Sequence, residues 1–205
     1  VLDDGSMFHG FSFGFDKAVA GEVVFNTAMT GYPESLTDPS YEGQILVTTY
    51  PILGNYGVPS PDVKNSDSVE EYFESSRIHC EAIICQDYSS NPSHWQSQRT
   101  LSEWLRQERI PGLYGIDTRR LTKLLRTHGS MLGKITFPDT GEDIDWHDPN
   151  RENLIAKVST REIREFGKGD KHVVLVDCGT KYNIIRCLTR RGVRVTLVPL
   201  SLIHI

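Results

Sequence analysis

Hydrophobic residues gather in short runs along the chain, and these runs predict strands separated by turns. The runs lie at Gly21–Thr27, Gln44–Tyr50, His79–Cys85, Leu113–Ile116 and Met131–Ile135. They show little clean alternation of polar and apolar positions, which is typical of strands covered on both faces. Residues 1–14 predict a hairpin, because the pair Asp4-Gly5 favours a tight turn.

Two segments in the middle of the chain show the spacing of amphipathic helices. Leu101, Trp104 and Leu105 recur at i, i+3 and i+4, so they share one buried face. We expect this helix to begin near residues 91–93, with Ser93 as its N-cap. A short helix over residues 69–74 is a further expectation, within an otherwise polar loop.

The second helix is predicted over residues 119–127. Asp117 and Thr118 precede it as capping residues, and Gly129 follows it as a C-terminal stop. Arg119 and Arg120 lie on this helix, and two interpretations stay open for them: contact with a partner, or a solvated helix face.

The last part of the chain predicts a second structural unit. Strand His172–Asp177, helix Lys181–Arg191 and strand Val193–Pro199 form a right-handed βαβ unit, which requires a parallel sheet. The acidic, turn-rich stretch 138–151 indicates a boundary before it. We therefore assign residues 1–150 to a first domain, 151–170 to a linker and 171–205 to the truncated start of a second domain. Two strands and one helix bury little apolar surface, so we expect this last part to be loosely held.

Composition restricts the class of protein. The chain has 205 residues, of which 38% are hydrophobic and 24% charged, as in ordinary soluble globular proteins. A net charge of −5 argues against a nucleic-acid binder. No apolar run approaches the roughly 20 residues that span a bilayer. The chain has no initiator Met and no visible signal or transit peptide, so we expect the natural N-terminus to lie upstream.

The four cysteines predict neither disulfides nor a metal site. They are Cys80, Cys85, Cys178 and Cys187. None forms a C-x-x-C pair, and no histidine lies near them at zinc-finger spacing. Buried free thiols are the preferred interpretation, and they fit a reducing compartment.

The stretch Gly31–Tyr41 lies between two of the predicted strands. It is dense in Gly, Pro, Asp and Ser, which fix an irregular backbone. A rigid polar loop between two buried strands can present a hydroxyl or amide to a ligand. An ordinary turn between strands is the alternative.

The order of several motifs resembles the small chain of carbamoyl-phosphate synthetase. These motifs are Gly21–Thr27, Gly31–Glu34, Leu36–Tyr41, Tyr50-Pro51, Gly54–Gly57, Gly115–Arg119 and Gly129–Lys134. The resemblance extends from Val1 to about Pro199, and a long ordered series is more specific than any single motif. Residues 153–160 and 167–169 look most like the fused animal synthetases of the mitochondrial kind.

The resemblance implies an α/β fold in two parts. A mixed β/α small-chain domain would be followed by the first βαβ unit of a flavodoxin-like class I glutamine amidotransferase domain. The complete protein would take ammonia from glutamine. A large synthetase subunit or fused region would join that ammonia to bicarbonate, for pyrimidine or for arginine and urea synthesis. That region would use ATP and Mg, and no cofactor is expected in this one. The implied compartment is mitochondrial or cytoplasmic, with the mitochondrial one favoured.

The same resemblance leaves this chain without a catalytic residue. The family's nucleophile lies in a Gly-x-Cys-x-Gly turn and its base in a His-Pro-Glu segment, and this sequence contains neither. Cys178 lies on a strand-to-helix turn near Lys181, but its context matches the domain's first strand instead of the nucleophile turn. We therefore expect the fragment to be inactive alone.

One functional residue carries over from the family. Ser40, in the Asp-Pro-Ser-Tyr loop, would contact bound L-glutamine across the domain boundary, since a hydroxyl suits an amino-acid ligand. The alternative is a serine that stabilises its own turn by bonding to the backbone.

Other functions stay open or are disfavoured. The chain could be a non-catalytic interaction domain of an ammonia-using mitochondrial synthetase. A free-standing nucleotide binder is disfavoured, because no Gly-x-Gly-x-x-Gly follows the strand at Val173. The sequence does not decide between a fused and a separate subunit. Residues 201–205 depart from the family, and one hypothesis is that they leave the true reading frame.

Overall fold

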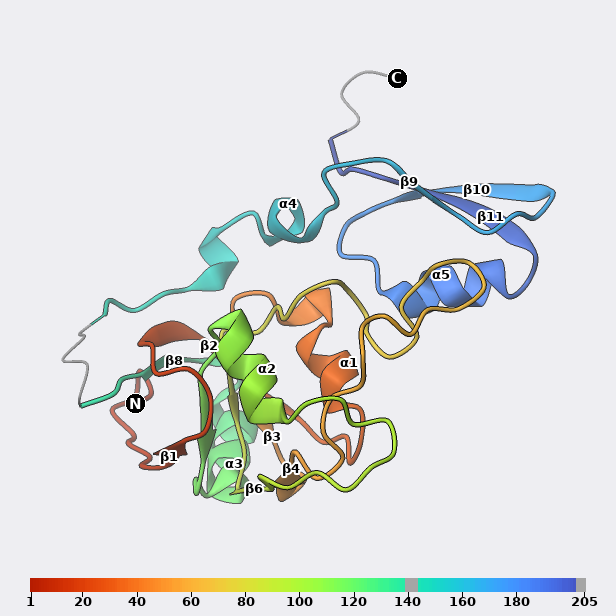
Figure 1. Ribbon diagram of the computed structural model, residues 1–205. Coiled ribbons are helices and arrows are strands. Elements are labelled where there is room, and N and C mark those ends of the chain that lie inside the picture. Colours follow the sequence, from red (N-terminus) through yellow and green to blue (C-terminus); the bar gives the residue numbers. More distant parts are fainter. Residues whose placement is uncertain (139–143, 202–205) are drawn as a thin grey trace.

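The computed structural model describes residues 1–138 and 144–201, and its larger part is built on a six-stranded sheet of order β1-β7-β5-β3-β2-β8 (Figure 1). Strands β2, β3, β5 and β7 run parallel, while β1 and β8 pair antiparallel at the two edges. The strands are β1 (Phe11–Ser12), β2 (Val19–Asn26), β3 (Gln44–Thr48), β5 (Ala82–Ile84), β7 (Gly112–Tyr114) and β8 (Met131–Ile135). The predicted α/β class is confirmed.

Both faces of this sheet are covered, as the unbroken apolar runs predicted. On β3, Leu46 belongs to the core that includes residues of helix α2 (Leu101–Glu108). Its neighbours Ile45 and Val47 point to the opposite core, which contains residues of helix α3 (Thr118–His128). Alternate side chains of one strand therefore serve two hydrophobic layers.

The predicted hairpin over residues 1–14 does not form. The turn exists, with Gly5 at φ 85°, but its two arms pair with different strands. Leu2 bridges Gly133 of β8, whereas β1 pairs with β7 at the other edge of the sheet. Residues 1–14 therefore pair with backbone groups of β8 on one side of the sheet and of β7 on the other. A local hairpin would leave those groups unpaired.

The first long helix begins later than predicted, and the short helix over residues 69–74 is absent from that described segment. Thr100, not Ser93, is the N-cap of α2. The Thr100 hydroxyl accepts from the Glu103 N–H at 3.1 Å, and the Glu103 carboxylate accepts from the Thr100 N–H at 2.7 Å. This reciprocal capping box satisfies two backbone donors, which explains why the helix begins here. Val69 is buried in a core of the C-terminal unit, and that packing replaces the helix.

Thr100→Ala should destabilise the protein by about 1 kcal/mol, because the Glu103 N–H at the start of α2 loses its acceptor. Urea unfolding followed by circular dichroism measures this. Ser93→Ala is the matched control, since Ser93 is exposed and caps no helix. An equal loss in both variants would contradict the assigned cap.

The remaining elements lie around and beyond the main sheet. They are α1 (Tyr32–Leu36), η1 (Pro39–Tyr41), β4 (Ile52–Leu53), β6 (Asp87–Tyr88), η2 (Pro149–Arg151), α4 (Leu154–Val158), β9 (Arg164–Phe166), β10 (Lys171–Val176), α5 (Tyr182–Thr189) and β11 (Val193–Val198). β4 and β6 form a separate two-stranded sheet. The described residues 144–201 form no helix of the length and apolar character that crosses a membrane, and neither do residues 1–138.

The predicted strand–helix–strand unit is confirmed. β10 and β11 are parallel, with α5 between them in the sequence. β9, inside the predicted linker, pairs antiparallel with β11 and completes a three-stranded sheet. The boundaries at residues 150 and 170 stay a prediction. Residues 139–143 and 202–205, which include part of the acidic stretch and most of the unusual tail, lie outside the described residues.

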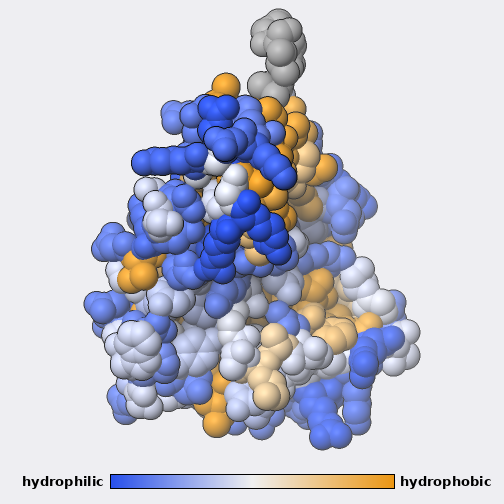
Figure 2. All heavy atoms as spheres, turned by 90° about the vertical axis from the view of Figure 1, so that its right-hand side faces the viewer, coloured by the Kyte–Doolittle hydropathy of each residue, from blue (hydrophilic) through white to orange (hydrophobic). Residues whose placement is uncertain are grey.

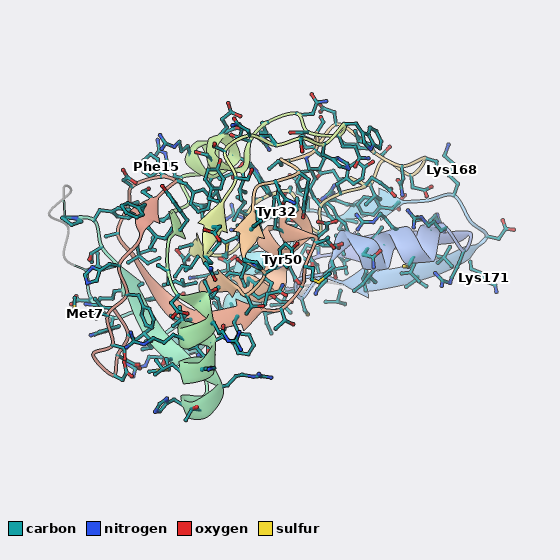
Figure 3. The ribbon with its side chains drawn as sticks, turned by 90° about the horizontal axis from the view of Figure 1, so that it is seen from below. Met7, Phe15, Tyr32, Tyr50, Lys168 and Lys171 are labelled. Atoms are coloured by element: carbon teal, nitrogen blue, oxygen red, sulfur yellow. The ribbon has the colours of Figure 1, made fainter. Side chains whose placement is uncertain are left out.

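The C-terminal unit packs against residues before β5, while its looseness stays a prediction. Its core includes Val69, from the loop before β5, together with Tyr182, Ile185 and Leu197. Figure 1 shows α5 beside the loop that precedes β5. Lys168 and Lys171 lie at the opposite end of the unit, away from the first domain (Figure 3).

One face of the C-terminal sheet is apolar and exposed. Figure 2 shows hydrophobic residues at the surface of the upper part of the molecule. The exposed residues of β10 include Val174 and Val176, with 57% and 46% of their surface accessible. Parallel sheets are normally covered on both faces. The sheet of this unit therefore has one face that is not covered by the described residues.

Candidate functional site

The stretch that carries Ser40 is two short helical turns, not the irregular loop that was predicted. Helix α1 (Tyr32–Leu36) is followed by the 3-10 turn η1 (Pro39–Tyr41). Asp38 caps η1, because its Oδ1 accepts from the Ser40 N–H at 2.9 Å. Pro39 at the first position of the turn has a fixed φ, so backbone and cap together set the direction of Ser40.

The side chain of Ser40 is available to a ligand. Ser40 is exposed, and among the described residues its hydroxyl makes no hydrogen bond. The turn is stabilised by the Asp38 carboxylate, so the alternative of a self-bonded, turn-stabilising serine does not fit this geometry. Contact between Ser40 and glutamine stays a prediction.

The Ser40 turn touches the C-terminal unit directly. Lys181 Nζ donates to Asp38 Oδ2 at 2.6 Å, so one carboxylate both caps the turn and binds the second unit. Gly179 lies so near that a Cβ added there would be 3.3 Å from Pro39 Cβ, and its φ of +95° also favours glycine. The candidate site is therefore a junction, assembled from residues about 140 positions apart.

A polar cluster supports the turn from the main sheet. Asn26, at the end of β2, donates through Nδ2 to Ser35 Oγ at 3.1 Å and to Tyr41 Oη at 3.2 Å. Burial raises the pKa of Tyr41, so its hydroxyl stays neutral and able to accept. The turn is thus anchored to a strand end, which limits its movement.

Cys178 is exposed on the turn after β10, whereas the sequence predicted a buried thiol. Among the described residues, no hydrogen bond or ion pair activates it. The neighbouring Asp177 is buried, and it accepts the N–H groups of Gly179 and Thr180 at 3.0 and 2.8 Å. A thiol without a nearby base is a poor nucleophile.

Cys80 and Cys85 are buried and free, as predicted, while Cys187 is half-buried. Burial raises the pKa of the Cys80 thiol, and it raises that of Cys85 to about 12. Within residues 1–138 and 144–201, no group of three or more His, Cys, Asp or Glu residues could hold a metal ion.

A buried ion pair joins the two units and was missed by the sequence analysis. Arg186 of α5 donates to Glu74 Oε1 at 2.8 Å and to the carbonyls of Glu70 and Phe73 at 2.6 and 2.8 Å. The side chains of Arg186 and Glu74 are only 5% and 12% exposed. No local pattern could pair residues that are 112 positions apart.

A second missed cluster centres on the buried His79. Its Nδ1 lies 2.6 Å from Glu42 Oε2 and its Nε2 lies 2.9 Å from Ser75 Oγ. Burial alone would raise the pKa of Glu42, but the hydrogen bonds and charges of His79 and Arg77 together lower it. The Ser75 hydroxyl also donates to the Thr37 carbonyl at 2.6 Å, so it is held as a structural link.

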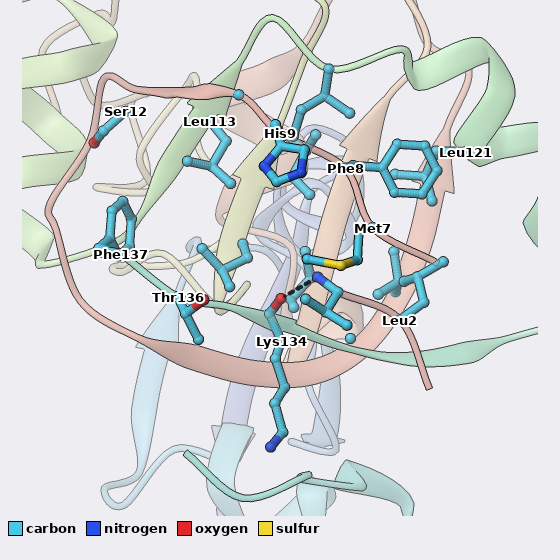
Figure 4. Close-up of a pocket in the computed structure, with 18 of the residues that line it drawn as sticks. Leu2, Met7, Phe8, His9, Ser12, Leu113, Leu121, Lys134, Thr136 and Phe137 are labelled. Carbon is cyan, nitrogen blue, oxygen red and sulfur yellow. Dashed lines mark hydrogen bonds between the residues drawn. The ribbon is translucent and has the colours of Figure 1, made fainter. Parts of the chain in front are cut away.

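A cavity of about 360 Å³ lies between the N-terminal segment and the main sheet (Figure 4). Its walls are mostly apolar, with Leu2, Phe8 and Leu121 among the lining residues. The Val1 ammonium donates to the Lys134 carbonyl at 2.9 Å. No Asp or Glu lines the cavity, so its lining offers no acid–base pair for catalysis. We interpret it as a gap in packing.

Comparison with known proteins matches this chain to one family. A family model described as carbamoyl-phosphate synthase small chain, CPSase domain, matches residues 1–135. The mouse protein named "Carbamoyl-phosphate synthase [ammonia], mitochondrial" is 49% identical over 97% of this chain. "Multifunctional protein CAD" of Squalus acanthias is also 49% identical over 97% of the chain.

The relatives are longer than this chain. It spans 13% of the mouse protein and 9% of the shark protein. The "Carbamoyl phosphate synthase arginine-specific small chain" of Saccharomyces cerevisiae is 45% identical over 97% of the chain, which covers 49% of it. With both the family model and these relatives in agreement over most of its length, the chain belongs to the carbamoyl-phosphate synthase small-chain family.

Proposed function

We propose that this chain is the N-terminal part of a glutamine-dependent carbamoyl-phosphate synthase. In the complete protein, glutamine would be hydrolysed in an amidotransferase domain that begins with the β10–α5–β11 unit, of flavodoxin-like type. The ammonia would pass to a large synthetase region, which would use bicarbonate, ATP and Mg. The product would enter pyrimidine, arginine or urea synthesis, in mitochondria or in the cytoplasm. This chain itself would hold no cofactor.

The observation that carries the proposal is the exposed Ser40 hydroxyl at the junction of the two units. The Asp38 cap holds the Ser40 backbone through its N–H, and Lys181 brings the start of the second unit against the same carboxylate. A free hydroxyl on a held backbone can donate to the carboxylate, or accept from the ammonium, of a free amino acid. The uncovered face of β10 fits further strands and helices of an amidotransferase domain.

A non-catalytic role in an ammonia-using synthetase is the second candidate. It is favoured by the similarity to the mouse protein whose name specifies ammonia. Identity does not separate the two candidates, because the shark CAD protein is equally similar at 49%. The residue at the nucleophile position of the complete protein separates them.

The test is carbamoyl phosphate synthesis by the complete protein, with glutamine and with ammonium as alternative nitrogen sources. Synthesis from glutamine supports the first candidate. Synthesis from ammonium alone, with another residue in place of the nucleophilic cysteine, supports the second. Synthesis from neither would contradict both.

The 205-residue chain alone should release no ammonia from glutamine, because the exposed Cys178 has no base beside it. A coupled glutamate dehydrogenase assay measures this, with heat-denatured chain as the control. Cys178→Ser should leave the background unchanged. Ammonia release above the denatured control, lost in Cys178→Ser, would contradict the assignment of Cys178.

Ser40→Ala in the complete protein should raise the glutamine KM by roughly ten- to a hundred-fold. Loss of one hydrogen bond to a charged ligand costs about 1.5–3 kcal/mol. Ammonium-dependent synthesis should stay nearly unchanged. Ser66→Ala is the matched control, an exposed serine outside the junction. If both nitrogen sources lost activity together, Ser40 would be a folding residue.

A further inference from the structure

A polar cavity of about 470 Å³ lies where the first domain, the connector and the C-terminal unit meet. The first domain contributes Arg77, the connector contributes Lys157 and Arg161, and the last sheet contributes Arg164 and Leu197. Pro39 and Thr180 also line it, so the cavity adjoins the Ser40 turn, although Ser40 and Lys181 themselves are not part of its lining.

The charges around this cavity are strongly unbalanced. Arg77 pairs with Glu42 at 2.8 Å, and Lys157 pairs with Glu152. Arg161 and Arg164, in contrast, form no ion pair within the described parts of the chain. Arg164 Nη1 donates to Tyr182 Oη at 3.3 Å, but neither guanidinium has a carboxylate partner among the described residues.

The single carboxylate of the lining is already occupied. Asp177 Oδ1 accepts from Gly179 and Thr180, and Oδ2 accepts from the Thr160 N–H at 2.7 Å. It is buried, and its oxygens are engaged by the backbone. Asp177 thus holds the cavity wall together and is not positioned as a counter-ion for Arg161.

Hydroxyl donors complete the wall. Ser76 and Thr180 line the cavity, and their hydroxyls make no hydrogen bond to described residues. Guanidinium groups bind phosphate or carboxylate oxygens with two parallel hydrogen bonds, and hydroxyls add further donors. The combination of guanidinium and hydroxyl donors matches an oxyanion better than a cation.

We propose that this cavity binds a small multivalent anion that carries phosphate or carboxylate groups. Arg161 and Arg164 supply the charge, and Ser76 and Thr180 supply neutral donors. Because the donors come from three segments of the chain, the bound anion stabilises the docking of the C-terminal unit on the first domain. This inference does not depend on the glutamine reaction.

The test is isothermal titration of the chain with sodium pyrophosphate and, separately, with sodium succinate, at constant ionic strength. We expect saturable binding of at least one anion, and the anion that binds identifies the acidic group. Arg161→Gln should weaken binding roughly ten- to a hundred-fold, as expected for lost charge-assisted hydrogen bonds. Arg126→Gln, on the exposed face of α3, is the matched control for charge and should bind as the unmodified chain does.

Arg161 is substituted instead of Arg164 so that a loss of binding does not reflect unfolding. Arg164 also stacks on Phe166 and Tyr182, so Arg164→Gln could loosen the last sheet. Arg161 has no such contact among the described residues, and circular dichroism should show Arg161→Gln folded. Failure of both anions to bind saturably, or equal weakening in Arg126→Gln, would overturn the proposal.

Discussion

Arg186→Met should destabilise the docked C-terminal unit by about 3–5 kcal/mol. The substitution leaves the Glu74 carboxylate and the Glu70 and Phe73 carbonyls buried without their donor. An uncompensated buried charge costs far more than a surface pair contributes. Hydrogen exchange of the β10 and β11 amides measures the loss, with urea unfolding as a second measurement.

Arg190→Met is the matched control for this variant. Arg190 lies on the same helix and pairs with Glu71 of the same loop at 2.7 Å, but it is 57% exposed. An exposed pair contributes about 0–1 kcal/mol. Similar losses in both variants would show that the buried network does not hold the units together.

The four thiols should differ in reaction rate with Ellman's reagent by about a thousandfold or more. At a pKa of about 12, Cys85 carries about one thiolate in 10,000 molecules near pH 8, and burial also excludes the reagent. Cys178 is exposed and should react first, while the half-buried Cys187 should react more slowly. Since the pKa values of Cys80 and Cys85 are raised, raising the pH should accelerate them only well above the range where an ordinary thiol ionises.

Absorbance at increasing times separates these classes. Cys178→Ser should remove the fastest phase, and denaturant should make all remaining thiols react together. Fast labelling of Cys80 or Cys85 in the native chain would contradict the core that surrounds them.

The elements predicted correctly are those whose signal is local. The apolar runs of β2 and β3, and the cap and stop of α3 at Asp117 and Gly129, depend on neighbouring residues alone. The predicted start of α2 was wrong because Ser93 and Thr100 are both residue types that cap helices. The Glu103 side chain, which completes a capping box with Thr100, distinguishes them. A capping-box search from Thr100 would have found it.

The candidate site was only partly predictable. Ser40 came from the family resemblance, and no feature of its own residues distinguishes it from an ordinary turn. The roles of Asp38 and Lys181 depend on a contact across 143 positions, which no periodicity reveals. The unpaired Arg161 and Arg164 likewise become a feature only when three segments meet. Tertiary packing decides which distant charged residues pair, and the sequence alone does not show which of them lie close together.

Helix α5 has no side-chain cap of its own, and Glu74 supplies one from the other domain. The Glu74 carbonyl accepts from the Tyr182 N–H at 2.9 Å, and Glu74 Oε2 accepts from the Asn183 N–H at 2.8 Å. On the ribosome, Glu74 is made 109 residues before Asn183, roughly 5–20 seconds earlier. Synthesis from the N-terminus therefore makes the capping residue before the helix that it caps.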